Sequence, residues 1–399
     1  MRSLMSSQRF GGALVSGLMG AAFAAGIAPT GQPAQAEEFV AEIMERASLG
    51  ERLYFDVDLS ANGTMSCATC HDPESGFADP RVTDAGRAVS LGDDGVSLGD
   101  RNTPSIGYAG FSPPFHQRAD GAYVGGQFWD GRVTNLAEQA GGPPLNPIEM
   151  GMPSKEAVVE RLRANADYVT AFERLYGAGV LQDADAGYSA MMDAIASFER
   201  TEQFAPFDSK YDRYLRGEVE LTRDEELGRV LFFSQQFTNC NLCHQLETSP
   251  VSRFETFSNY EYHNIGTPVN ERARALNGID EEYVDVGLLA NPAVEAPDAA
   301  GKFKVPTLRN VAVTGPYMHN GVFEDLRTVV LFYNKYNSRA EARQINPETG
   351  EPWRAPEVPD TLSVEQLTHG PALDDQRIDA LVAFMKTLTD ERYEHLLEE

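Results

Sequence analysis

Apolar residues recur at helical spacing in two short segments that resemble each other. Residues 49–55 (Leu-Gly-Glu-Arg-Leu-Tyr-Phe) and 227–233 (Leu-Gly-Arg-Val-Leu-Phe-Phe) both place apolar side chains at positions i, i+3 and i+4. This spacing predicts one short amphipathic helix in each segment. The second helix also has a capping-box sequence at its start, Thr222-Arg223-Asp224-Glu225.

Three longer segments have the same periodicity, and we interpret their apolar stripes as packing surfaces. They are residues 155–176, 188–201 and 374–389, the last with Ile378, Leu381, Val382, Met385 and Leu388 along one side. Patterns typical of strands are few, so the sequence predicts a mainly α fold. Residues 72–147 are rich in Gly, Pro, Asp and Asn, and we expect them to be mostly ordered loop with a functional role.

The charge balance of the chain is strongly acidic. Its 399 residues include 60 acidic and 33 basic side chains, which gives a formal net charge of −27. This argues against nucleic acid as a partner, because affinity for phosphates comes mainly from Lys and Arg. Hydrophobic residues make up 42% and aromatic residues 10%, which indicates a folded chain rather than a disordered one. The length suggests two or three domains.

Residues 1–36 have the layout of a secretory signal peptide. Arg2 and Arg9 form a basic start, residues 11–28 are apolar, and Ala34-Gln35-Ala36 is a small-residue cleavage site. The alternative is a membrane anchor, but the apolar run is Gly-rich and no other long apolar stretch follows. We therefore expect export to the periplasm and no membrane span in the mature protein.

All four cysteines lie in two Cys-x-x-Cys-His strings, Cys67-Ala68-Thr69-Cys70-His71 and Cys240-Asn241-Leu242-Cys243-His244. This string is the attachment site of c-type haem, in which the thiols bond to the porphyrin and the histidine ligates the iron. A zinc site made of the four cysteines would leave both histidines unexplained. Disulfides or redox-active cysteine pairs would not require a histidine. The sequence therefore predicts two covalently bound haem c groups.

The two haem motifs start 173 residues apart, and each follows one of the two similar helices. A helix, a haem loop and a closing helix together describe a cytochrome c domain. The repeat predicts two such domains in tandem, residues 37–205 and residues 206–399, each with one covalent haem.

Several further blocks complete a resemblance to the bacterial di-haem cytochrome c peroxidases. They are Arg101-Asn102-Thr103-Pro104, Phe128-Trp129-Asp130-Gly131-Arg132, Glu138-Gln139-Ala140 with Asn146–Met150, Tyr262–Gly266, Lys304–Asn310 and Gly315–Gly321. The resemblance covers nearly all of the chain after residue 36. Within the family, the sequence is most similar to the enzymes that complete the tryptophan tryptophylquinone cofactor of methylamine dehydrogenase. It implies a high-spin haem in the first domain and a low-spin haem in the second.

The resemblance makes Tyr333 the most informative single position. Ordinary members of the family place a methionine here as the distal ligand of the second haem, whereas the tryptophylquinone-forming enzymes have a tyrosine. A thioether ligand favours reduced iron, and an anionic tyrosine oxygen favours higher oxidation states. A haem held by His244 and Tyr333 is therefore expected to store an oxidising equivalent. Met318 is a different position, inside the Pro-Tyr-Met-His block.

The first haem is expected to have His71 as its only protein ligand. Residues 72–100 contain no histidine, and His116, a minor candidate ligand, falls after the Arg-Asn-Thr-Pro block. Gln139 and Glu149 match the polar residues that the family places over the open haem, and Pro143 matches a residue of the same pocket. The resemblance makes Glu149 the acid/base catalyst of peroxide cleavage, because this reaction moves a proton between the two oxygens.

Two tryptophan positions bear on electron transfer. In the family, the residue that matches Trp129 lies between the haems and relays a hole between them. Trp353 lies in a polar stretch, and we interpret it as a surface or packing residue. The tryptophylquinone-forming enzymes carry a tryptophan that faces the partner two residues before the second haem motif. Thr238 occupies this position here, beside Phe237, so the exit route or the partner must differ.

The family also binds one calcium ion between its domains. The resemblance assigns this Ca²⁺ to Asn102 and to the backbone carbonyls of Thr314 and Pro316, an oxygen ligand set that suits the ion.

The implied function is oxidation of tryptophan residues in a partner protein, the expected partner being a methylamine dehydrogenase precursor. The oxidant is hydrogen peroxide, or O₂ plus electrons. One alternative is a peroxidase that reduces hydrogen peroxide with electrons from a small c-type cytochrome or a cupredoxin. A second is a di-haem electron carrier, and a third is a related enzyme that modifies tryptophan in a different partner.

Overall fold

The computed structural model describes residues 33–249, 251–280 and 282–398. The predicted signal segment lies outside the described residues, except that residues 33–36 form the first turn of helix α1. The helices are α1 (Pro33–Tyr54), α2 (Cys67–Cys70), α3 (Leu136–Ala140), α4 (Lys155–Ala164), α5 (Ala166–Tyr176), α6 (Ala184–Phe198), α7 (Lys210–Leu215), α8 (Arg223–Phe233), α9 (Glu271–Leu276), α10 (Leu326–Asn334), α11 (Val364–Leu367) and α12 (Asp375–Lys386).

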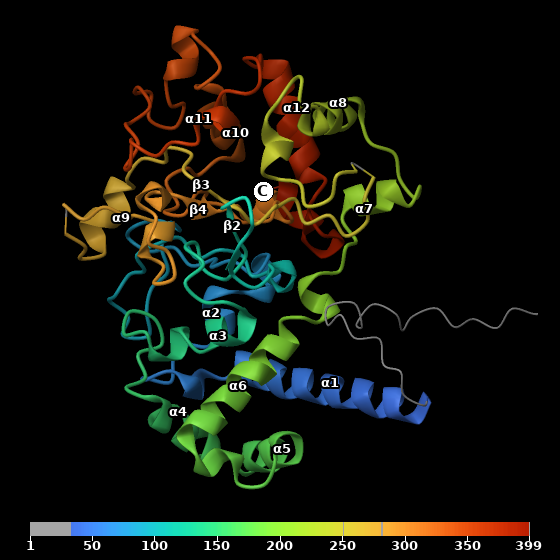
Figure 1. Cartoon of the computed structure of the whole chain (residues 1–399), viewed down its shortest axis with the longest axis vertical. Helices are drawn as coiled ribbons and strands as arrows, with labels where there is room; N and C mark the ends of the chain where they lie inside the picture. The colour runs from blue at the N-terminus through green and yellow to red at the C-terminus, as the bar shows by residue number, and fades with distance from the viewer. Residues whose placement is uncertain (1–32, 250, 281, 399) are drawn as a thin grey trace, which may run out of the picture.

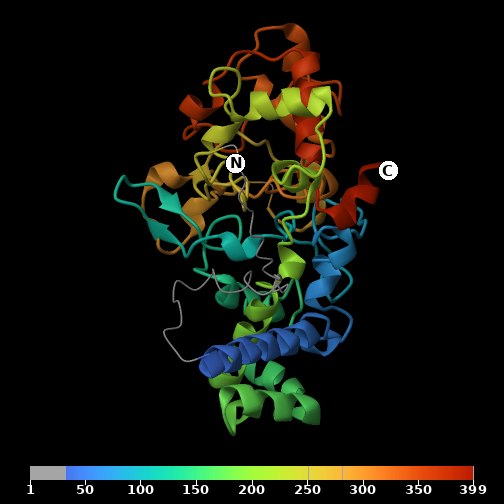
Figure 2. The ribbon, with the colours of Figure 1, turned by 90° about the vertical axis from the view of Figure 1, so that its right-hand side faces the viewer.

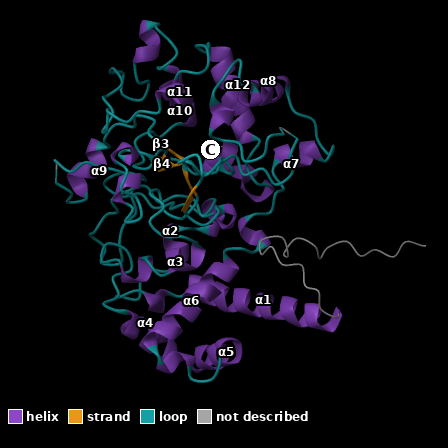
Figure 3. Cartoon of the chain, in the orientation of Figure 1, coloured by secondary structure: helices purple, strands orange, loops and turns teal. Residues whose placement is uncertain are grey.

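Regular structure in the described residues is almost entirely helical (Figure 3). The strands β1 (His116–Gln117) and β2 (Tyr123–Val124) form one antiparallel pair, and β3 (Tyr262–His263) and β4 (Phe303–Lys304) form another. The mainly α prediction is therefore confirmed. Long loops fill the middle of the molecule between the helical ends (Figure 1).

The N-terminal helical group consists of α1, α4, α5 and α6, at one end of the molecule (Figures 1 and 2). Its core is a cluster of buried residues to which all four helices contribute. Helix α1 crosses α6 at Gly50, where an added Cβ would lie 1.9 Å from the carbonyl oxygen of Ala194 and 2.9 Å from Cβ of Phe198. Only a glycine allows this approach.

The C-terminal helical group consists of α7, α8, α10 and α12, at the other end of the molecule (Figure 1). Here α8 crosses α12 at Gly228, where an added Cβ would lie 1.9 Å from the carbonyl oxygen of Ala380 and 2.7 Å from Cβ of Phe384. The two crossings therefore use the same residue types in the same order, a glycine on the first helix and an alanine and a phenylalanine on the second.

Several helix boundaries differ from the sequence prediction. The helix expected at residues 49–55 is the last part of the 22-residue α1. The single helix expected at residues 155–176 is broken between α4 and α5 at Asn165, because the side chain of Asn165 accepts hydrogen bonds from the backbone of Asp167 and Tyr168 and caps α5.

The remaining helical predictions are close to the structure. Helix α6 begins four residues before the expected start and ends at Phe198. The capping box of α8 is present, since Thr222 and Glu225 each accept a hydrogen bond from the other's backbone N–H. Asp374 caps α12.

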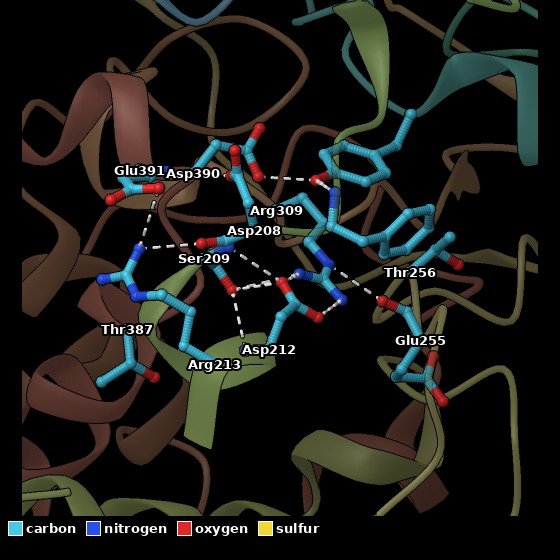
Figure 4. A network of polar contacts seen from close by, with 12 residues as sticks. Asp208, Ser209, Asp212, Arg213, Glu255, Thr256, Arg309, Thr387, Asp390 and Glu391 are labelled. Carbon is cyan, nitrogen blue, oxygen red and sulfur yellow. Dashed lines mark hydrogen bonds and ion pairs between the residues drawn. The ribbon is translucent and has the colours of Figure 1, made fainter. Parts of the chain in front are cut away.

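A buried polar network of the C-terminal half (Figure 4) bonds to one residue of the N-terminal half, Tyr108. Arg309, 2% exposed, forms an ion pair with Asp212 of α7 and donates to the carbonyl oxygen of Glu255 at 2.9 Å. Beside it, the Tyr108 hydroxyl from the N-terminal part of the chain donates to Asp390 at 2.6 Å. Asn310 donates to the other oxygen of Asp390 at 2.8 Å. These contacts fix the position of one half relative to the other.

Candidate functional site: two histidine-bearing cavities

The first cysteine pair lines a cavity of about 550 Å³. Helix α2 is the single turn between Cys67 and Cys70, and His71 follows it directly. Nδ1 of His71 donates to the carbonyl oxygen of Phe77 at 3.2 Å, which fixes the ring and makes Nε2 the nitrogen that would bind a metal. Burial lowers the pKa of His71, so its imidazole is neutral, the form that ligates iron.

The second cysteine pair lines a separate cavity of about 210 Å³. His244 follows Cys243, and its Nδ1 donates to the carbonyl oxygen of Phe257 at 3.0 Å. Burial lowers the pKa of His244 to about 4. The second site therefore repeats the arrangement of the first, with a neutral histidine held by a backbone carbonyl.

Both cavities fit a covalently attached haem. Each has two thiols one helical turn apart, a histidine whose Nδ1 is bonded to a backbone carbonyl, and largely apolar surroundings. The two cysteine pairs line different cavities, so they do not form the four-cysteine zinc site considered from the sequence.

The predicted distal residues meet in the first cavity. Gln139 reaches it from α3, and Pro143 and Glu149 reach it from the loop that follows. Burial raises the pKa of Glu149, and the side-chain amide of Asn146 donates to its Oε1 at 2.9 Å. The structure places His116 elsewhere: it is exposed on β1, and its Nδ1 bonds to the carbonyl oxygen of Pro114.

Tyr333 lines the second cavity together with His244. It lies near the end of α10, whose start is capped by Asp325, and burial raises the pKa of its phenol. Met318, which the sequence analysis distinguished from this position, also lines the cavity and has a left-handed backbone with φ of 72°.

Trp129 lines both cavities. Its indole Nε1 donates to the carbonyl oxygen of Asn102 at 2.8 Å, and its own carbonyl accepts from the backbone of Lys304 at 2.9 Å. The first bond fixes the indole ring and the second fixes the backbone of Trp129, in the wall that the two cavities share.

The three predicted calcium residues lie in two loops. The backbone N–H of Asn102 donates to the carbonyl oxygen of His319 at 2.8 Å, and its side-chain amide donates to Ala88 at 3.1 Å. The Thr314 hydroxyl donates to the carbonyl oxygen of Asn310 at 3.1 Å, and Pro316 follows in the same loop. The bond from Asn102 to His319 brings its loop next to the Pro-Tyr-Met-His block.

The position expected to face a partner is not at the surface. Thr238 is 3% exposed, and its hydroxyl donates to the carbonyl oxygen of Leu231 at 2.7 Å. Its neighbour Phe237 is 44% exposed and also lines the second cavity. Trp353 packs edge-on against Phe323 and Phe332, so it is the packing residue that the sequence analysis proposed.

The sequence analysis did not single out two charged residues that line the cavities, Glu199 and Lys304. Glu199 follows α6 and lines the first cavity, and Lys304 of β4 lines both cavities with its pKa lowered by burial to about 8. The sequence around each residue has no pattern that distinguishes a buried charged side chain from an exposed one. Lys304 was part of a quoted block, but nothing in the block marked its side chain as buried.

The comparisons with known proteins agree with this geometry. The profile of the family described as di-haem cytochrome c peroxidase matches residues 44–220. The chain is 58% identical to the methylamine utilization protein MauG of Paracoccus denitrificans over 353 residues, which are 88% of this chain and 90% of that protein. The chain belongs to the di-haem cytochrome c peroxidase family.

Other members of the di-haem cytochrome c peroxidase family are more distant. Cytochrome c peroxidase Ccp of Escherichia coli is 34% identical over 75% of this chain and 55% of that protein. The solved structure of the di-haem peroxidase BthA from Burkholderia thailandensis matches with a TM-score of 0.75 and 32% identity, over 87% of this chain and 86% of that one. The protein is therefore an oxidoreductase with two haems. Among the described helices, none has the length and apolar character needed to cross a membrane.

Proposed function

We propose that this protein is a MauG-like enzyme that oxidises tryptophan residues of a partner protein, using hydrogen peroxide or O₂ plus electrons. The partner is a methylamine dehydrogenase precursor, and the reaction completes its tryptophan tryptophylquinone cofactor. The observation that carries this proposal is Tyr333 in the wall of the second cavity, at the position where an ordinary family member is expected to have a methionine. The 58% identity to MauG supports it.

The proposal includes the organisation predicted from the sequence. Residues 37–205 and 206–399 are two cytochrome c domains, each with one covalent haem c, preceded by a signal peptide that directs the chain to the periplasm. The repeated crossings at Gly50 and Gly228 support this division. One Ca²⁺ is held by Asn102, Thr314 and Pro316.

The first cavity is where peroxide is cleaved. When bound there, haem would supply the iron for peroxide chemistry, and His71 would hold that iron. Glu149 takes the proton from the near oxygen and returns it to the leaving one, and its raised pKa suits both transfers. Gln139 orients the peroxide, and Pro143 excludes water from the pocket.

Trp129 connects the two cavities. Its indole N–H already donates to the carbonyl oxygen of Asn102. The hydrogen-bond acceptor is therefore in place before the charge of the indole changes. Tyr333 and His244 together provide the ligand set of the second cavity, and the anionic form of Tyr333 stabilises a higher oxidation state there. A partner protein is too large to enter either cavity, so the electrons of its tryptophans arrive by long-range transfer.

A second candidate function is peroxide reduction with electrons from a small c-type cytochrome or a cupredoxin. The observation that favours it is the similarity to Ccp of Escherichia coli, which is named a cytochrome c peroxidase. This function predicts fast turnover with such a donor and no reaction until one haem has been reduced.

The test is direct. The holoenzyme is incubated with hydrogen peroxide and a methylamine dehydrogenase precursor that lacks the quinone, and the quinone absorbance of the product is followed. The proposal predicts quinone formation by the wild-type enzyme and its loss in Tyr333→Met. Formation of no quinone, together with fast peroxide turnover on a reduced small cytochrome, would instead support the second function.

A further inference from the structure

Glu199 is a carboxyl group that the mechanism above does not use. It directly follows α6, its residue is 5% exposed, and it forms part of the wall of the first cavity. Its Oε2 is buried and has no hydrogen-bond partner among the described residues. A buried carboxylate without partners is strongly disfavoured relative to its neutral acid.

The equivalent position in the second half has no charge. Counting from the two helix crossings, Ala194 and Phe198 correspond to Ala380 and Phe384, so Glu199 corresponds to Met385. Met385 is 8% exposed and lines the second cavity. The fold therefore accepts an apolar side chain at this place, and the carboxyl in the first half is not needed for packing.

The groups around Glu199 do not neutralise it. Tyr54 of α1 and Cys67 of α2 lie near it and are themselves uncharged, and Arg200 is the one cation among the described residues that lowers its pKa. Burial raises the pKa of Glu199 to about 8, so it carries a proton at neutral pH. Glu149 and Glu199 both raise the pKa of Cys67, so both carboxyl groups lie in the part of the cavity around its thiol.

We propose that Glu199 is a second proton-holding residue of the first cavity. It supplies a proton to the oxygen atom that remains after O–O cleavage, when the substrate donates its electrons. The proposal rests on the peroxide chemistry proposed above. Reduction of peroxide consumes two electrons and two protons per H₂O₂ and gives two waters. Cleavage of the O–O bond by Glu149 moves a proton within the peroxide and consumes none. Both protons are therefore needed in the later step, when the partner's tryptophans supply the electrons: Glu199 gives one, water gives the other, and Glu199 then regains its proton from water.

The first measurement detects the proton itself. Infrared spectra of the ferric holoenzyme at pH 7 are compared for wild type, Glu199→Gln and the control Met385→Leu. We expect a protonated carboxyl band that shifts in D₂O, is absent from Glu199→Gln, and remains in Met385→Leu. A spectrum of Glu199→Gln identical to that of the wild type in this region would overturn the proposal. This readout does not depend on any activity.

The second measurement separates the two acids kinetically by stopped-flow spectroscopy. Hydrogen peroxide is added first and ascorbate second. In Glu199→Gln we expect the peroxide phase to be unchanged and the ascorbate phase to slow by about 10²–10⁴-fold, the typical contribution of a positioned acid that acts directly. Glu149→Gln should slow the peroxide phase instead.

The outcomes separate this proposal from the proposed function. If the wild type does not react with peroxide, the proposed function fails, whereas the infrared band still tests whether Glu199 holds a proton. If the wild type reacts and both phases are normal in Glu199→Gln, the proton role of Glu199 is wrong and the proposed function stands. The apolar variant Glu199→Met, matched to Met385, should behave like Glu199→Gln in the ascorbate phase.

Discussion

At the scale of single residues, burial decides the chemistry of the two cavities. It keeps His71 and His244 neutral, as iron ligation requires, and it raises the pKa of Glu149 above that of an exposed glutamate. The same effect raises the pKa of Tyr333, so only a cation such as iron can stabilise its phenolate there. The site therefore holds its groups in forms that bound haem would use.

Glu149→Gln should lower the rate of the peroxide reaction by about 10²–10⁴-fold, because an amide cannot carry the proton. In the wild type, the rate should fall with decreasing pH as Glu149 becomes protonated and can no longer act as a base. Because its pKa is raised, this fall should begin at a higher pH than for an ordinary glutamate. Stopped-flow rates at several pH values check both expectations. A variant with an unchanged rate would exclude Glu149 as the base.

Tyr333→Met should raise the reduction potential of the second haem, since a thioether favours reduced iron. Axial ligands set haem potentials over a span of about 0.8 V, so a shift on the order of hundreds of millivolts is expected. Spectroscopic redox titration of both haems measures it, and the first haem is the internal control. Equal potentials in wild type and variant would show that Tyr333 does not bind the iron.

At the scale of elements, the fold is organised by two helix crossings. Gly50 lets α1 approach α6, and Gly228 lets α8 approach α12, with an alanine carbonyl at the contact in both cases. Each crossing is next to a cysteine pair, because α2 follows α1 and the second haem motif follows α8. The crossings therefore determine where each histidine enters its cavity.

Gly228→Ala should destabilise the protein by about 1–3 kcal/mol or more, because the new methyl group overlaps the carbonyl of Ala380. Gly50→Ala should do the same at the other crossing. Glu51→Ala, at an exposed position of α1, is the control and should change stability by less than about 0.5 kcal/mol. Chemical denaturation of the holoenzyme measures all three, and wild-type stability in both glycine variants would refute the crossing argument.

The periodicity of apolar residues predicted α8 and α12 to within a few residues because both helices bury one face and have clear caps. It did not predict the break at Asn165, since the apolar stripe continues through it and the capping bonds are local. The cysteine strings located both cavities. They gave no sign of Glu199, because burial of a side chain beyond a helix end depends on packing that the sequence pattern does not encode.

At the scale of the whole molecule, the two halves of the chain are joined by the Tyr108–Asp390 hydrogen bond, beside a buried ion pair of the C-terminal half. Arg309 lies under the rings of Tyr108, Phe207 and Phe257 and is paired with Asp212. At the end of the chain, the Tyr393 hydroxyl donates to the carbonyl oxygen of Pro73 at 2.6 Å, so the C-terminal segment returns to the first half (Figure 1). Trp129 can serve both cavities only while this arrangement is fixed.

Arg309→Met should cost about 3–5 kcal/mol of stability, because Asp212 is left buried and unpaired. The double variant Arg309→Met with Asp212→Asn removes both charges and should recover part of this loss. Denaturation of the wild type, Arg309→Met, Asp212→Asn and the double variant gives the coupling energy between the two residues. Losses that simply add would show that the ion pair does not stabilise the junction.

The most direct test of the central claim is the spectral response of the fully ferric holoenzyme to one equivalent of hydrogen peroxide, without prior reduction. A MauG-like enzyme should show both haem spectra changing together, the oxidised state should persist without a donor, and Trp129→Phe should make the second haem respond more slowly than the first. If neither haem changes until one has been reduced, Tyr333 does not have the proposed role and the protein is a peroxidase that depends on a small electron donor.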